Sequence, residues 1–169
     1  MTLQDTIRYF TEEPRIMPCL SVACGTASTV LTAHGGYADE ERGVLLTEGS
    51  LFDLASLTKF FTALIVMCLR EEGRIDLTRP VTAYAPQFTR LSGVTVDQVL
   101  GFEIALTTDG RVDAQTSPEA GRALLYDIRP GEVTGRAYSD MHAMVLRYVV
   151  EGAAGEDYVT LLNQLILAP

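Results

Sequence analysis

Two residues near the first third of the chain have types and a spacing that suit nucleophilic chemistry. Ser56 is followed three positions later by Lys59, the only lysine in a chain with twelve arginines. Residues three apart on a helix share a face, so this hydroxyl and amine can meet. A lysine can lose its proton when it is desolvated, whereas an arginine effectively cannot. The pair indicates a nucleophilic serine with a lysine partner; the alternative is a surface lysine beside a serine that caps a helix.

A long helix, expected over residues 53–72 and closed by Gly73, must position this pair. Ser56 and Lys59 fall in its first turn or two. There the helix dipole disfavours an ammonium ion and favours a developing oxyanion. The middle of the helix, residues 60–69, is apolar nearly all round. We therefore expect other elements to pack on several of its sides and to desolvate the amine further.

The rest of the chain predicts helices and one hairpin in a single domain without repeats or a linker. A capping box at 95–98, Ser117 before Pro118, and Ser139-Asp140 each indicate a helix start. Gly155 separates the third of these helices, which ends near Glu151, from a last one. The remaining expected elements are a helix over 2–12, strands over 19–24 and 28–33 ended by Gly35-Gly36, a turn at Pro130-Gly131 and a helix over about 156–167.

The formal net charge of −9 and the pI of about 4.6 argue against a nucleic-acid partner and against binding to an anionic membrane. The first residues contain no basic region followed by an apolar run, and residues 60–69 are too few to span a bilayer. A cytoplasmic location is therefore the default expectation, unless a leader was removed.

Metal and cofactor sites are not expected. The three cysteines, at positions 19, 24 and 68, have no C-x-x-C spacing and predict buried free thiols. His34 and His142 have no second ligand at metal spacing. The chain contains no P-loop and no G-x-G-x-x-G, so no motif indicates a nucleotide cofactor. It contains no G-x-S-x-G elbow, so no motif indicates an α/β-hydrolase fold.

A series of segments in a fixed order extends the Ser56–Lys59 pattern. Taken together, they cover about residues 20–169 and resemble the serine β-lactamase-related family, which includes class C β-lactamases, D-alanyl-D-alanine carboxypeptidases and related esterases. The resemblance implies an α/β fold of the α+β type, namely the helix-rich N-terminal part of the β-lactamase/penicillin-binding-protein fold with a short antiparallel sheet. The segments are 34–39, 51–59, 62–64, 72–77, 80–81, 94–100, 130–131, 138–140 and 166–169.

The resemblance also implies roles for residues. Ser56 would attack a carbonyl of an ester, a D-amino-acid amide or a β-lactam, in a small-molecule or peptide substrate, and water would hydrolyse the acyl-enzyme. Lys59 and Tyr138 would share the proton transfers, since Tyr138 matches the first residue of the family's Tyr-x-Asn motif. A phenol beside an ammonium has its ionised form favoured. Without the resemblance, Tyr138 would be interpreted as a half-buried core tyrosine.

Two departures from the family pattern affect the substrate side. Asp140 stands where the family most often has Asn, and it would contact substrate. An ionised Asp cannot donate a hydrogen bond to a substrate carbonyl, and it would repel a substrate carboxylate. It would also pair with Lys59 and hold it protonated. The alternative is that Asp140 caps a helix. After Leu100 the family usually reads His-Thr-Ser-Gly, whereas this chain reads Gly-Phe-Glu-Ile over 101–104.

The family's third motif, Lys-Thr-Gly or His-x-Gly, would lie on a strand beyond Pro169, and His34-Gly35-Gly36 is better interpreted as a turn than as its substitute. The resemblance therefore implies a truncated domain whose exposed hairpin edge and apolar helix would favour self-association into a homo-oligomer. Two hypotheses stand: a serine hydrolase, or a non-catalytic ligand-binding pseudoenzyme or inactive fragment.

Overall fold

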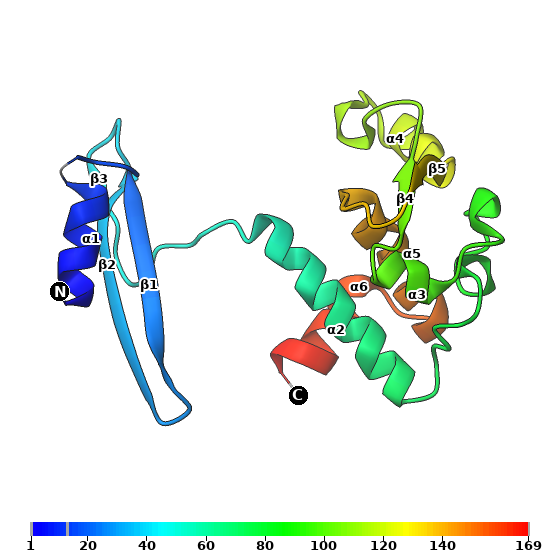
Figure 1. The fold of residues 1–169 in the computed structure, drawn as a ribbon, viewed down its shortest axis with the longest axis horizontal. Helices are drawn as coiled ribbons and strands as arrows, with labels where there is room; N and C mark the ends of the chain where they lie inside the picture. The colour runs from blue at the N-terminus through cyan, green and yellow to red at the C-terminus, as the bar shows by residue number, and fades with distance from the viewer. Residues whose placement is uncertain (1, 13, 169) are drawn as a thin grey trace. The chain divides into compact units, whose positions relative to one another are not determined.

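The computed structural model describes residues 2–12 and 14–168, and its contacts group the chain into two compact units. Unit 1 ends at Asp53 and unit 2 begins at Leu54. Both are seen in Figure 1, where unit 1 is blue to cyan. Each unit has its own buried side chains. The expectation of a single domain stays a prediction.

Unit 1 is a helix on a three-stranded antiparallel sheet of order β1-β2-β3. The helix begins with a capping box, in which the Thr2 side chain accepts from the Asp5 amide and the Asp5 side chain accepts from the Thr2 amide. In Figure 1, α1 lies along the β1–β2 hairpin, and Ile7 is its most deeply buried residue. The elements are α1 (Leu3–Thr11), β1 (Cys19–Thr26), β2 (Thr29–Asp39) and β3 (Val44–Leu45).

The second strand is longer than the sequence predicts. Gly35 and Gly36 lie inside β2, paired with Leu20 and Cys19, and do not end the hairpin or form a turn. The physical reason is close packing. A Cβ on Gly35 would come within 2.6 Å of the Ile7 side chain, so glycine lets the helix approach the sheet.

Unit 2 contains most of the helices and a second, two-stranded antiparallel sheet, β4-β5. The predicted helix starts at Thr95 and Ser117 are confirmed, since their side chains accept from the amides of Gln98 and Ala120. Gly155 ends α5 in the left-handed region, at φ 69°. The elements are α2 (Thr58–Glu71), α3 (Val96–Leu100), β4 (Ile104–Thr107), α4 (Pro118–Tyr126), β5 (Arg129–Thr134), α5 (Asp140–Ala154), α6 (Tyr158–Leu162) and a π-helical turn (Asn163–Leu167).

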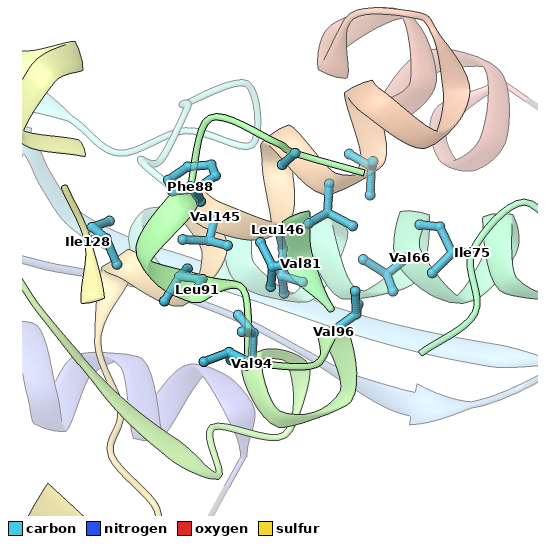
Figure 2. Packing of buried hydrophobic residues seen from close by; sticks show 14 of the residues in the cluster. Val66, Ile75, Val81, Phe88, Leu91, Val94, Val96, Ile128, Val145 and Leu146 are labelled. Carbon is cyan, nitrogen blue, oxygen red and sulfur yellow. The ribbon is translucent and has the colours of Figure 1, made fainter. Parts of the chain in front are cut away.

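The core of unit 2 forms where α2 and α5 pack together beside α3 and the loops that follow α2. Figure 2 shows Phe88, Leu91 and Ile128 beside Val145 of α5, with Val66 of α2 further along the same cluster. All five side chains are completely buried. This packing fixes the direction of α2, and therefore of the residues at its start.

α2 is fully buried along one face and only partly covered on its other sides. Ile65, Val66 and Leu69 are buried, whereas Phe60 is 62% exposed and Met67 is 37% exposed. The expectation of partners on several sides is met in part: α5, α6 and the π-helical turn contact α2, whereas Phe60 and Met67 stay exposed. Some of the apolar side chains over 60–69 therefore remain exposed after the packing within unit 2.

Pro130 and Gly131 lie in β5 rather than in a turn, because a proline is tolerated at the edge of a small sheet. The α+β fold with short antiparallel sheets is confirmed. No helix in the described parts of the chain is both long and apolar enough to cross a membrane.

Candidate active site

Ser56 lies in a 3-10 turn, Ala55–Leu57, that leads directly into α2. The residue before it, Ala55, has φ 43°, in the left-handed region that costs an L-residue roughly 1 kcal/mol or more. Leu57, the residue that precedes α2, makes no side-chain capping hydrogen bond. The serine hydroxyl is exposed at the positive end of this helix, where a developing negative charge is favoured.

Lys59 is the centre of the site. Its side chain is only 14% exposed, and its Nζ lies 3.2 Å from Ser56 Oγ. It also forms an ion pair with Asp140, the first residue of α5. The hydrogen bond with this carboxylate raises the pKa of Lys59, and partial burial only opposes the rise. The predicted Ser56–Lys59 and Lys59–Asp140 contacts are both present, and the lysine is held as an ammonium.

Tyr138 precedes α5 and lies over the same lysine. Lys59 Nζ is 4.9 Å from the centre of the Tyr138 ring, within the range of a cation–π contact. Hydrogen bonds with Ser56 and then with Lys59 lower the pKa of the Tyr138 phenol, since both favour the phenolate. The ring is 65% exposed, so the alternative of a core tyrosine is wrong.

An aromatic stack behind Tyr138 is a feature that the sequence did not reveal. The Phe102 ring stacks on Tyr138 at 5.2 Å between centroids and 22° between planes. Its other neighbour is His142, at 4.6 Å. The Phe102 carbonyl accepts from the Ala137 amide at 3.0 Å, and Phe102 itself has φ 54°. The sequence held one indication of this stack: Phe102 lies in the 101–104 segment, where the chain departs from the family pattern.

His142 is completely buried at the base of this stack. Its Nε2 lies 2.9 Å from the carbonyl oxygen of Ile104, so Nε2 carries the proton. Its Nδ1 then accepts from the Ser139 hydroxyl at 3.1 Å. Ser139 therefore stands at the helix start as predicted, but its side chain binds a histidine and not the helix backbone. The histidine ties β4 to the segment that carries Tyr138.

Two hollows lie at the site, and both are lined by Asp140 and Met144. The smaller hollow, of about 340 Å³, contains Ser56 and Lys59. The larger, of about 570 Å³, lies between Tyr138 and the loop over 108–113. Both volumes are in the range of small-molecule sites. A substrate carbonyl at Ser56 would thus have space on two sides of Asp140.

The remaining candidates take no part in this arrangement. His34, Gly35 and Gly36 belong to β2 of unit 1. The cysteines are free, but Cys24 is exposed and the other two are half-buried, so the expectation of buried thiols is wrong. Among the described residues, no group of three or more His, Cys, Asp or Glu side chains could hold a metal ion.

Comparison with known proteins identifies the family. The model of the beta-lactamase family matches residues 7–169. The chain belongs to the beta-lactamase family. A curated relative, the teichoic acid D-alanine hydrolase of Staphylococcus aureus strain MRSA252, is 29% identical over 125 residues. That match covers 73% of this chain and 32% of the relative, so the chain spans about a third of the length of this relative.

Solved structures agree with this assignment at the level of the fold. A class C beta-lactamase superposes with a TM-score of 0.79 at 22% identity, over 97% of this chain and 48% of that one. FmtA from Staphylococcus aureus gives a TM-score of 0.78 at 23% identity, over 88% of this chain and 44% of that one. The segments quoted above as resembling this family therefore belong to a domain of that fold.

Proposed function

We propose that this chain supplies the nucleophile and proton-transfer groups of a serine hydrolase that works through an acyl-enzyme. The observation that carries the proposal is the 3.2 Å contact between Ser56 Oγ and Lys59 Nζ, at the start of α2 and beside Tyr138. A serine, an ammonium and an acidified phenol in mutual contact are the groups that acyl transfer needs.

In this proposal Tyr138 is the base, because Asp140 keeps Lys59 protonated. The Ser56 hydroxyl gives its proton to the Tyr138 phenolate while Oγ bonds to the substrate carbonyl carbon. The bond to the leaving group then breaks, and the leaving oxygen or nitrogen takes the proton from Tyr138. Water repeats the cycle on the acyl-enzyme. Lys59 stabilises the phenolate and the negative charge that develops near Ser56.

The substrate classes are an ester, a D-amino-acid amide or a β-lactam. The curated relative is named a teichoic acid D-alanine hydrolase, and this name favours substrates with a D-aminoacyl group among these classes. Penicillins carry a carboxylate, which Asp140 would repel. We therefore place esters of D-amino acids before β-lactams.

The second candidate is a non-catalytic module that binds such ligands. Asp140 favours it, because the ammonium–carboxylate pair occupies Lys59 and neutralises the charge beside the serine. A pseudoenzyme would keep the hollows and the fold but would form no covalent bond at Ser56.

Intact-mass spectrometry separates the two candidates. The chain is incubated with a fluorescent penicillin and with an activated ester, and Ser56→Ala serves as the matched control. The enzyme predicts an added acyl mass on the native chain or release of the ester's alcohol, and neither in Ser56→Ala. If the native chain shows neither adduct nor turnover above that control, the hydrolase proposal fails for this chain.

A further inference from the structure

The charges around the two hollows suggest which substrates this site accepts. We propose that Asp140 selects substrates by charge: the site takes acyl groups that bear an ammonium beside the reacting carbonyl, and it disfavours acyl groups that bear a carboxylate there. This inference rests on the proposed hydrolase function and adds a specificity-determining residue to it.

The first observation concerns the cations that line the hollows. These are Lys59 in the smaller hollow and Arg111 in the larger one. Each is already paired. Lys59 is bound to Asp140, and Arg111 holds Asp113 through two hydrogen bonds of 3.0 and 2.5 Å. Among the residues that line the two hollows, no unpaired cation is left to receive a substrate carboxylate.

The second observation concerns the anion. Asp140 uses Oδ1 for Lys59, while Oδ2 has no hydrogen-bond partner among the described residues. The Asp140 side chain is 73% exposed and lines both hollows. It is therefore a carboxylate with one oxygen open to a ligand. An ammonium that approaches it completes a charge-assisted hydrogen bond without disturbing the pair with Lys59.

The third observation concerns the distance between the Asp140 carboxylate and the nucleophile Ser56 Oγ. The Asp140 carboxylate lies no more than two hydrogen bonds from Ser56 Oγ, through Lys59 Nζ. A nitrogen on the carbon next to an attacked carbonyl can span this distance. The group selected is thus an α-ammonium, as in an ester of a free amino acid. The net charge of −9 acts in the same direction, because it attracts cationic substrates at a distance and repels anionic ones.

The test uses three 4-nitrophenyl esters of nearly equal size. They are the esters of D-alanine, of 2-methylpropanoic acid and of methylmalonic acid, whose carbon next to the ester bears an ammonium, a methyl group or a carboxylate. Rates are measured at about pH 6.5, where an α-amino group is protonated, and the Ser56→Ala rate is subtracted for spontaneous hydrolysis. We expect kcat/KM to fall in that order.

The decisive variant is Asp140→Asn, which keeps the shape of the side chain and removes its charge. We expect the preference for the D-alanine ester over the 2-methylpropanoate to fall by about fivefold, the factor that a partly exposed charge pair supplies. The methylmalonate ester should gain relative to both. The matched control is Glu71→Gln, an equal change of charge at the opposite end of α2, which should leave the order of the three esters unchanged. An equal loss on all three esters in Asp140→Asn would overturn the inference.

A binding measurement keeps the inference independent of turnover. In the Ser56→Ala variant, saturation-transfer NMR compares D-alaninamide with its neutral isostere, 2-methylpropanamide. Stronger binding of D-alaninamide that disappears in Ser56→Ala with Asp140→Asn supports charge selection, even if the esters show that the hydrolase proposal is wrong. Equal binding of the two amides overturns it, even if the esters are hydrolysed.

Discussion

At the scale of single residues, Asp140 decides what Lys59 can do. A lysine beside a nucleophile acts as a base only if its ammonium is destabilised, and partial burial alone would have that effect. The carboxylate of Asp140 outweighs the burial and raises the pKa of Lys59, while the phenol of Tyr138 is made more acidic. The contact between Ser56 and Lys59 followed from their spacing. The raised pKa of Lys59 depends on a contact across 81 positions, which the local pattern does not encode and only the family resemblance implied.

The first prediction concerns the pH profile of ester hydrolysis. Activity should rise with pH as Tyr138 ionises below its usual pKa of 10.0, and fall where Lys59 loses its proton above its usual 10.5. Asp140→Asn removes the largest cause of the high Lys59 pKa, so the alkaline limb should move to lower pH. The acidic limb should move less, because Asp140 is the smallest influence on Tyr138. An unmoved alkaline limb, measured with initial rates, would contradict this assignment.

The second prediction concerns Phe102, which positions Tyr138 by stacking between it and His142. Phe102→Leu removes the flat surface and should lower kcat by about tenfold, the cost of losing an aromatic contact of roughly 1 kcal/mol together with the alignment it provides. KM should change little, because Phe102 lines neither hollow.

The matched variant for this prediction is Phe102→Tyr, which keeps the ring and should restore most of kcat. Circular dichroism of each variant checks that the fold is retained. If leucine and tyrosine lower kcat equally, or if Phe102→Leu raises KM alone, the stack does not position the phenol.

At the scale of elements, the helix starts were predictable and the small sheet was not. The capping signals at Thr95 and Ser117 are local, because each side chain binds an amide three residues away. The β4–β5 sheet depends on a pairing between residues 104–107 and 129–134 that no short-range pattern encodes. Pro130 and Gly131 even argue against a strand there. The stack of Phe102 on Tyr138 was missed for the same reason, since it needs this sheet and α5 in place.

The third prediction tests the packing of α5, which carries Asp140. A Cβ on Gly152 would lie 1.9 Å from the backbone carbonyl oxygen of Tyr84, and a backbone atom cannot rotate away. Helix propensity favours alanine by about 1 kcal/mol, and a steric overlap of this kind costs about 1–3 kcal/mol. A contact at 1.9 Å is severe, so we expect a cost near the upper end of this range, and Gly152→Ala should lower the free energy of unfolding by up to about 2 kcal/mol in urea denaturation.

Gly93→Ala is the control for this change. Gly93 has no atom within 4 Å of an added Cβ, so its replacement should alter the free energy of unfolding by less than about 0.5 kcal/mol. Equal stability of the two variants would mean that α5 does not depend on its close approach to Tyr84, and that the position of Asp140 is fixed by other contacts.

At the scale of the whole molecule, two properties of the surface oppose each other. Unit 2 exposes large apolar side chains at the start of α2, where Leu57 is 63% and Phe60 is 62% exposed. They are three residues apart and so lie on one side of the segment. Such a surface favours association, whereas a net charge of −9 makes copies of the chain repel one another.

The fourth prediction follows from this opposition: the chain self-associates, and salt promotes it. The Debye length falls from about 10 Å at 0.1 M to about 3 Å at 1 M salt, so repulsion between acidic copies weakens while apolar contacts do not. Light scattering after size-exclusion chromatography should show a mean mass that increases with sodium chloride over this range. Association through ion pairs would show the opposite dependence.

The surface responsible is identified by two sets of variants. Leu57→Ser combined with Phe60→Ser should keep the chain monomeric at high salt, because it removes the apolar contact area next to Ser56. Val159→Ser, at a residue of α6 that is 61% exposed, should leave the salt dependence unchanged. If both variants associate like the native chain, the start of α2 is not the interface. If only the first stays monomeric, self-association covers the residues next to the nucleophile, and ester hydrolysis should then decrease as salt drives assembly.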